Sequence, residues 1–549
     1  MSPGRIVRWR KLLYRGRTAL GEQRGVVVSA ARLSRRDMVK FSALGAAAVA
    51  LPLGRVVNAK AVSRLPASRL PKPYTLPFVV PPVLAPVGAT DRGEPIYEIR
   101  ERLATAEILP GFQTPVFGYN GMTPGPTIKA QRGQPIVVRM INELPATHPQ
   151  WGYTPWTSCH LHGSASKPQY DGYASDITQP GEVKEYHYPN IQDARTLWYH
   201  DHGVHHTAEN AYMGLAAQYH LTDGVEAGLP IPKGAYDVPL ILADKMFGVD
   251  GSFMYDDAGH SGLWGDVILV NGRPWPSMTV AKRKYRFRVL NASLSRGFRL
   301  QLGNGAPMTV IATDGGLMPA PQQTTQLRIG MAERYEVVID FAAYKKGDKV
   351  ELRNLGVPNS VDYDNTGKVM QFEVTDDPFD PAGNEVPAAL NPNMDVMGLL
   401  PAQAKTTTKI EVIRKNGFWT VNGQTWDDVI KSEYKKVVAN PKYDEIQIWE
   451  IKNSSGGWFH PVHIHLVDFQ ILDRNGKPPF AFEKGPKDVA YVGENEVVRA
   501  IMKFTNQTGR YMIHCHNLPH EDHDMMVQFR VGDDTADNDP IESDRPRKA

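Results

Sequence analysis

The chain is poor in cysteine, with only Cys159 and Cys515 among its 549 residues. A framework of disulfide bonds is therefore excluded as the basis of the fold. Long apolar runs are also missing. The apolar stretch at residues 41–53 is too short for a confident membrane span. No long amphipathic helical pattern stands out, and charge runs or low-complexity tracts are confined to the N-terminal leader and the polar C-terminal tail. The sequence predicts a protein without a stable membrane anchor.

An excess of positive charge is confined to the leader. The whole chain has a formal net charge of +3, but residues 1–61 hold 13 basic and 2 acidic side chains. This leaves 49 basic and 57 acidic side chains for the remainder, a net charge of −8. An acidic protein of this kind is not expected to bind nucleic acid.

The leader itself carries an export pattern. Arg35 and Arg36 precede the apolar stretch, and small residues at 59–61 offer a cleavage site. Twin arginines before a moderate apolar region are typical of a Tat signal, although a disordered basic N-terminus is the alternative. We expect export by the Tat machinery to the periplasm or the extracellular space.

Glycine and proline are plentiful, with 48 and 43 residues, and they favour many short strands and turns. Runs such as residues 284–290, 331–341 and 367–374 are rich in valine, tyrosine and phenylalanine, which favours strands. The length is too great for one core and suggests about three domains. The predicted fold class is all-β, with Greek-key sandwiches as the architecture.

Histidine and cysteine carry the strongest chemical signal. His514-Cys515-His516 places the thiol on one face of a strand and both imidazoles on the other, so the triplet can serve two metal sites. His520 and Met525 add a second imidazole and a soft thioether, as a blue-copper site requires. Three further groups present paired imidazoles that suit copper: His160 with His162, His200 with His202, and His460 with His463 and His465.

These four motifs, in this order and at these separations, closely resemble those of the multicopper oxidases. The segments at 195–214, 264–276, 284–298, 331–341, 362–372 and 460–469, with HCHNLPHEDHDMM at 514–526, look most like bilirubin oxidases. Bacterial spore-coat laccases are the next nearest relatives. The likeness covers roughly residues 119–531, and the leader and residues 375–445 match less well.

The resemblance implies three cupredoxin-like domains, placed at residues 75–225, 226–380 and 400–535, with a polar tail at 536–549. It also implies four copper ions. A type 1 copper would be held by His460, Cys515 and His520 with Met525 axial, and a type 2 copper by His160 and His463. A type 3 pair would be held by the other six histidines: His162, His200, His202, His465, His514 and His516.

Several nearby residues have alternative interpretations. Met526 competes with Met525 for the axial position, but the family spacing selects Met525. Cys159 is interpreted as a small buried residue rather than a redox or metal group. Asp171 and Glu521 match family positions for proton relays. The alternative for Asp171 is a turn residue, and the alternative for Glu521 is a solvated charge.

Aromatic and polar residues near the type 1 motif are candidates for the donor side. Trp458 precedes His460 by two residues and is expected on the same strand face, as an electron entry point or as an ordinary packed ring. His523 and Asp522 are candidates to line the donor's approach. His205 and His206 are interpreted as surface or supporting residues.

The implied activity is the one-electron oxidation of bilirubin-like tetrapyrroles, phenols or aromatic amines, coupled to the four-electron reduction of O₂ to water. A monomer is expected, with O₂ and a small aromatic or tetrapyrrole reductant as its partners. The alternatives are a laccase, a cuprous oxidase, and a copper-free structural protein of cell division with the same fold. Scattered methionines disfavour the second, and the full ligand set disfavours the third.

Overall fold

The computed structural model describes residues 63–549, so the expected Tat signal at residues 1–61 lies outside the described part. Strands dominate this part and the helices are short: the longest, α2, spans seven residues, Thr207–Met213. The prediction of an all-β fold is confirmed. None of the helices in residues 63–549 has the length and apolar character needed to cross a membrane. The other α-helices are α3 (Gly224–Gly228), α4 (Trp426–Lys431) and α5 (Leu518–Asp522).

Two sheets come from the first third of the described chain, and one of them also includes the last strand. The larger has the order β1 (Gly88–Ala89), β2 (Pro95–Ala106), β5 (Ile136–Asn142), β7 (Glu182–Tyr188) and β31 (Arg547–Lys548), with β3 (Thr114–Tyr119) paired to β2. The smaller has the order β4 (Ile128–Gln131), β9 (Ala216–Thr222), β8 (Arg195–Asp201) and β6 (Cys159–His162). The C-terminal segment, expected as a polar tail, thus returns to the first sheet.

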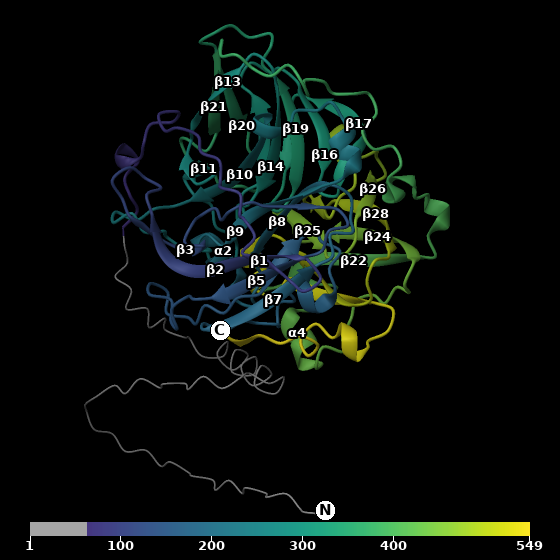
Figure 1. Cartoon of the computed structure of the whole chain (residues 1–549). Coiled ribbons are helices and arrows are strands. Elements are labelled where there is room, and N and C mark those ends of the chain that lie inside the picture. Colours follow the sequence, from purple (N-terminus) through teal and green to yellow (C-terminus); the bar gives the residue numbers. More distant parts are fainter. Residues whose placement is uncertain (1–62) are drawn as a thin grey trace, which may run out of the picture. The chain divides into compact units, whose positions relative to one another are not determined.

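The middle third forms a second pair of sheets, seen in teal and green at the top of Figure 1. One has the order β12 (Arg273–Pro274), β11 (Val267–Val270), β10 (Asp237–Lys245), β14 (Lys284–Asn291), β19 (Arg334–Asp340), β16 (Met308–Thr313) and β17 (Gly316–Thr324). The other has the order β13 (Ser277–Ala281), β21 (Lys368–Thr375), β20 (Lys349–Asn354), β15 (Phe298–Leu302) and β18 (Leu327–Ile329).

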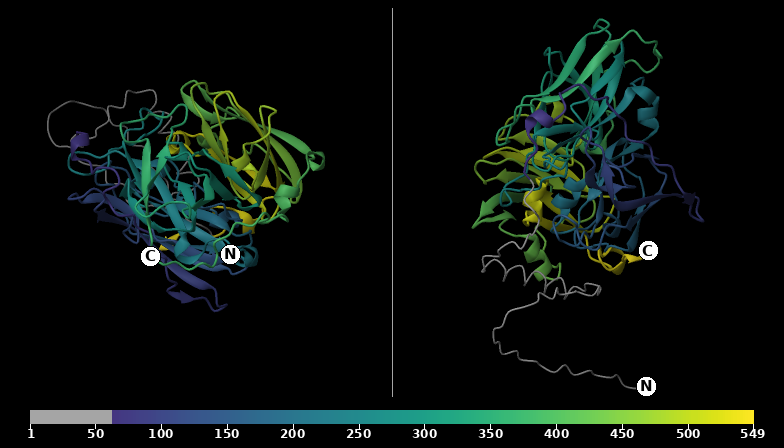
Figure 2. Two further views of the ribbon diagram at one scale, coloured as in Figure 1. Left: turned by 90° about the horizontal axis from the view of Figure 1, so that it is seen from above. Right: turned by 90° about the vertical axis from the view of Figure 1, so that its left-hand side faces the viewer.

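The last third forms the third pair, whose yellow-green strands group together in the left view of Figure 2. One sheet has the order β23 (Phe418–Val421), β22 (Thr406–Lys415), β24 (Glu445–Asn453), β28 (Val497–Phe504) and β26 (Phe469–Arg474). The other has the order β27 (Val489–Val492), β25 (His460–Ile464), β29 (Gly509–Cys515) and β30 (Met526–Val531).

Short 3₁₀ helices lie in the connections between strands. They are η1 (Ala67–Arg69), η2 (Pro168–Tyr170), η3 (Gly234–Tyr236), η4 (Asp395–Gly398), η5 (Pro401–Gln403), η6 (Ala481–Glu483) and η7 (Ala536–Asn538).

Strand β14 shows how the alternating pattern is used. Tyr285, Phe287 and Val289 are buried, as alternation predicts, but the intervening Arg286 and Arg288 are buried as well. Both guanidinium groups pair with the carboxylate of Glu336 on the neighbouring strand β19. Buried ions require such partners, since an isolated charge in the interior is costly. Both faces of this sheet are therefore covered.

Candidate metal centres

A compact site with two imidazoles and one thiol lies in the last third of the chain. His460 is the first residue of β25, Cys515 is the last residue of β29, and His520 lies in α5. All three are fully buried. Nδ1 of His460 lies 3.3 Å from Sγ of Cys515, and Nδ1 of His520 lies 3.8 Å from the same sulfur. The three ligand atoms converge as a site for a copper ion requires.

The outer nitrogens of these two imidazoles are occupied by protein groups. Nε2 of His460 lies 2.8 Å from Oγ of Ser455, and Nε2 of His520 lies 3.1 Å from the carbonyl oxygen of Ser261. Such contacts fix ring orientation and leave Nδ1 free for the metal. Burial raises the pKa of the Cys515 thiol, so a thiolate here requires a nearby cation.

Met525 is placed against this site by backbone hydrogen bonds. Its carbonyl accepts from the N–H of Cys515 at 3.0 Å, and its own N–H donates to the carbonyl of His520 at 2.9 Å. Met525 is fully buried. Met526 begins β30 and pairs in register with His514, on the neighbouring strand. The backbone of Met525 therefore bridges two of the site's residues.

The eight remaining motif histidines form a second group. Register pairs the motifs within the first and the last third of the chain: His160 lies opposite His200 across β6 and β8, and His463 lies opposite His514 across β25 and β29. Since residues two apart share a face of a strand, each register pair brings two H-x-H motifs together. All eight are buried: His160, His162, His200, His202, His463, His465, His514 and His516.

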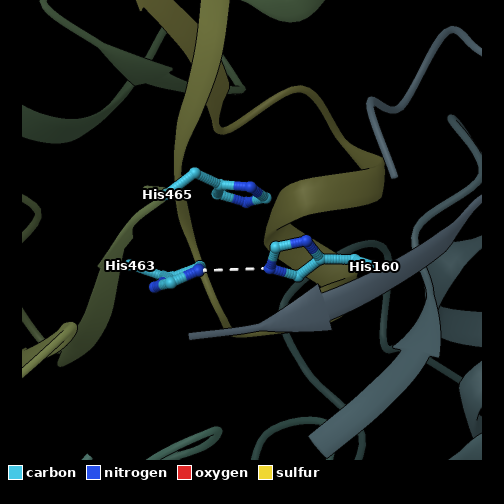
Figure 3. A group of neighbouring side chains, drawn as sticks. All are labelled: His160, His463 and His465. Carbon is cyan, nitrogen blue, oxygen red and sulfur yellow. Dashed lines mark hydrogen bonds between the residues drawn. The ribbon is translucent and has the colours of Figure 1, made fainter. Parts of the chain in front are cut away.

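The two halves of this histidine cluster meet face to face. Nε2 of His160 lies 3.4 Å from Nε2 of His463, and Figure 3 shows His463 and His465 turned towards His160 from the opposite strand. Nε2 of His202 lies 3.2 Å from Nε2 of His514. The group therefore joins strands from the first and last thirds of the chain.

The donor chemistry of the cluster fits copper. Buried nitrogens of three cluster histidines have neither a hydrogen-bond nor a carboxylate partner within residues 63–549, and burial lowers the pKa values of these three imidazoles. Neutral imidazoles with free nitrogens are the form that binds metal. The three are His162, His200 and His516.

Carboxylates flank the cluster on two sides. Asp171, which follows η2, places Oδ2 2.7 Å from Nδ1 of His465. Glu521, in α5, lies 3.3 Å from Nδ1 of His202 and 3.0 Å from Nδ1 of His514. Burial raises the pKa of Asp171 well above its usual value. Burial alone would also raise the pKa of Glu521, but His202 and His514 outweigh it and lower that pKa to about 2. The two carboxyls thus differ in their tendency to hold a proton.

Trp458 differs from expectation in its backbone and in its contact. Strand β25 begins at His460, so Trp458 precedes the strand and follows Gly456 and Gly457, both with positive φ. Its partly buried ring meets His520 edge-on, with ring centroids 5.3 Å apart. The prediction that it shares a strand with His460 was wrong, but it does lie beside the two-imidazole site.

Sequence reasoning missed two residues at these sites. The ring of Trp419 stacks on His520 at 3.8 Å, and the guanidinium of Arg414 lies over that indole. Asp488 contacts His162, with Oδ1 3.1 Å from Nε2. Neither follows from ligand spacing, because Trp419 precedes the HPxHxH motif by 41 residues and Asp488 follows His463 by 25.

The remaining candidates lie outside the two groups. His206 stacks on Tyr153 and His523 stacks on His260, while His205 is exposed. The carboxylate of Asp522 accepts hydrogen bonds from the first two N–H groups of α2, so its role is to cap that helix.

Cys159 is a free, buried thiol in the main core. Its own N–H donates to the hydroxyl of Tyr186 at 3.0 Å. Burial raises the pKa of the Cys159 thiol well above its usual value, which keeps it neutral. The interpretation as a small buried residue fits this environment, and no disulfide joins Cys159 to Cys515.

Comparison with known proteins agrees with this chemistry. Three multicopper oxidase family models match residues 102–224, 250–348 and 400–535. A bilirubin oxidase of Albifimbria verrucaria is 43% identical over 481 residues, which cover 83% of this chain and 81% of that protein. A laccase of Bacillus subtilis (strain 168) is 33% identical, over 83% of this chain and 97% of that protein.

A solved structure shares the fold. The McoA multicopper oxidase from the hyperthermophile Aquifex aeolicus superimposes with a TM-score of 0.73 at 30% identity, covering 83% of this chain and 100% of that one. Similarity extends over most of the chain, and the groups of buried histidines fit copper sites, as the multicopper oxidase family models imply. The chain belongs to the multicopper oxidases and is a copper-dependent oxidoreductase.

Proposed function

We propose that the enzyme is a bilirubin oxidase-like multicopper oxidase that binds four copper ions. The type 1 ion takes His460, Cys515 and His520, with Met525 axial, and the type 2 ion takes His160 and His463. The type 3 pair takes the other six cluster histidines: His162, His200, His202, His465, His514 and His516. Bound copper supplies one-electron oxidation of a reductant at the first site and reduction of O₂ to water at the cluster.

One observation carries this proposal. The sulfur of Cys515 belongs to the two-imidazole site, while its sequence neighbours His514 and His516 belong to the histidine cluster. The two sites are therefore joined by a few covalent bonds of one strand. This is the connection needed to pass single electrons from a donor site to a site that collects four.

The cluster also requires protons, because reducing O₂ to two waters consumes four of them. We propose Asp171 and Glu521 as the groups that deliver protons. Both are buried, and both carboxylates lie within 3.3 Å of a cluster imidazole. Asp171 favours its protonated form and Glu521 its ionised form, so one is suited to release a proton and the other to accept one.

The donor side favours aromatic reductants. Trp458, partly exposed, lies against His520, and Phe418 stacks on His523, three residues further along the chain from His520. We propose that bilirubin-like tetrapyrroles, phenols or aromatic amines give up electrons here one at a time, with Trp458 as an entry point. Electron transfer of this kind needs contact with a ring edge rather than an enclosing pocket.

The test is copper content measured together with O₂ uptake on bilirubin, a hindered phenol and cuprous ion. Four coppers per chain with a marked preference for bilirubin is the expected result. A preference for the phenol would assign the enzyme to the laccases, as the 33% identical relative would suggest. A preference for cuprous ion would assign it to the cuprous oxidases, and a folded protein without copper would sink the proposal in favour of a structural role.

We also propose domain boundaries and a location. Cupredoxin-like domains at residues 75–225, 226–380 and 400–535 each enclose one pair of sheets, apart from β31. Tat export to the periplasm or beyond fits the twin arginines Arg35 and Arg36. Replacing both arginines by lysine should leave the enzyme in the cytoplasm, as cell fractionation would show, and we expect a monomer by light scattering.

A further inference from the structure

Asp488 contacts two histidines of the cluster at once. It lies just before β27, with Oδ1 3.1 Å from Nε2 of His162, and its backbone carbonyl accepts from Nδ1 of His463 at 2.9 Å. Asp488 is 1% exposed. A ring nitrogen that is hydrogen-bonded to protein turns the other nitrogen of the ring towards the metal.

The result differs between the two rings. His463 is left with Nε2 facing the cluster, where it meets Nε2 of His160. His162 is left with Nδ1, which is buried and has no hydrogen-bond partner within the described chain. The two contacts of Asp488 therefore select opposite nitrogens on two histidines whose rings stack at 3.6 Å.

Asp488 is held by an arginine from the middle third of the chain. Arg334, the first residue of β19, donates from two nitrogens to the two carboxylate oxygens of Asp488, at 2.7 and 2.6 Å. Its other N–H groups donate to the carbonyls of Thr196, Ala332 and Asp314. A planar fork bound in this way fixes the angle of the carboxylate, which a lysine cannot do.

The backbone around Asp488 is held from the same side. Oδ2 of Asp314 accepts from the N–H groups of Asp488 and Val489, at 3.2 and 3.1 Å. Lys487 places Nζ 2.9 Å from Asp314 and 2.7 Å from Glu333. All these charged groups are buried. Buried ion pairs add little net stability, because the cost of removing the charges from water offsets their attraction.

We propose that Arg334 and Asp488 are positioning residues of the histidine cluster, through which the middle domain sets the metal-facing nitrogens of His162 and His463. This inference rests on the proposed function, since it takes both histidines as copper ligands. It gives the middle domain, which supplies none of the proposed ligands, a part in copper binding that is exerted through Asp488.

The test compares two buried arginines of one sheet. Arg334→Lys keeps the charge and loses the fork. Arg286→Lys makes the same change on β14, where the arginine is equally buried and pairs with Glu336 and Glu226 instead of a residue at the cluster. Asp488→Asn, which keeps the volume, is a second variant should Arg334→Lys fail to fold.

The readout is cluster copper relative to type 1 copper, at a series of buffered copper concentrations. Contacts that orient metal ligands are worth about 10–100-fold in metal affinity. We expect a loss of that order at the cluster for Arg334→Lys and Asp488→Asn, with the blue type 1 absorption intact and the type 2 resonance signal altered. Arg286→Lys should change neither.

The outcomes separate the two proposals. A parent protein without copper would refute the proposed function itself. A parent with four coppers, and variants at 334 and 488 that bind cluster copper as the parent does, would overturn this inference alone. Equal copper loss in Arg286→Lys would also overturn it, because the effect would then belong to any buried arginine of the sheet.

Discussion

Single residues divide one strand between two sites. Around Cys515 the alternation of side chains sends the thiol to the donor site and both neighbouring imidazoles to the cluster. Met526 is the first residue of β30 and pairs with His514, whereas Met525 precedes the strand and its backbone contacts Cys515 and His520. One position in the sequence thus separates the methionine proposed as the axial ligand from its competitor.

Met525→Leu should raise the reduction potential of the type 1 copper. An axial thioether stabilises the oxidised ion relative to an alkyl group, so its removal makes the site a stronger oxidant. Redox titration of the blue absorption measures this directly. Met526→Leu is the matched control and should leave the potential unchanged; a shift in the control alone would make Met526 the axial ligand.

Asp171→Asn and Glu521→Gln should each slow turnover by on the order of 10²-fold or more, because a positioned proton donor or acceptor typically contributes that much. Copper content should stay at the parent value. O₂ uptake at saturating reductant, with copper measured on the same sample, checks both points. Full turnover in either variant with copper intact would remove that residue from the proton path.

Some residues of the two sites could be predicted from the sequence and others could not, for a physical reason. The ligand candidates follow from their spacing, because side chains that are two positions apart on a strand point to the same face. Asp488 and Trp419 contact His162 and His520 only through tertiary packing, and no local period relates them. Trp458 was expected on a strand, but two glycines with positive φ precede it and the strand begins later.

Among the elements, strands β6 and β8 and strands β25 and β29 repeat one arrangement. Each antiparallel pair sets two H-x-H motifs in register. All-β character was predictable from short alternating runs and abundant turns. The burial of both faces of β14 was not predictable from the sequence. The charges of Arg286 and Arg288 indicate an exposed face unless their partners on other strands are known.

Strand β2 makes stability depend on pH. Burial raises the pKa of Glu101 to about 8, and its carboxyl contacts Oγ1 of Thr157 at 2.6 Å. Between its ordinary pKa near 4.5 and about 8, the folded protein holds a proton that the unfolded chain releases. Stability from this group is therefore complete below that window and falls by about 1.4 kcal/mol per pH unit as the pH rises through it.

Glu101→Gln should remove this dependence. At pH 8 the variant should unfold at a higher temperature than the parent, and near pH 4.5 the two should coincide. Thermal unfolding followed by circular dichroism at both pH values provides the measurement. Glu98→Gln, on the same strand but at a partly exposed carboxylate paired with Arg100, should give no gain at pH 8.

In the whole molecule, the histidine cluster joins the first and last thirds of the chain. Its histidines come from β6 and β8 on one side and from β25 and β29 on the other, at or just beyond the strand ends. Binding energy at such a site is also energy that holds the two parts together. The middle third contributes through Arg334, which reaches Asp488 at the same place.

Removal of copper should lower the unfolding temperature, because a ligand that binds the folded state stabilises it by about 2.7 kcal/mol per site at 100 times its dissociation constant. The chelated protein should unfold at a lower temperature and be cut faster by a protease. Adding copper back should restore both values. An unfolding temperature that does not respond to copper would show that the metals do not hold the parts together.

The histidine cluster takes its residues from both ends of the fold, and this determines when during synthesis the cluster can form. His516 follows His160 by 356 residues. At 5–20 residues per second, a ribosome needs roughly 20–70 s to make the intervening chain. Until His516 has been made, the earliest histidines lack the opposite half of the cluster, so copper can fill the cluster only after that point. Metal delivery must therefore wait for a folded protein rather than accompany a growing one.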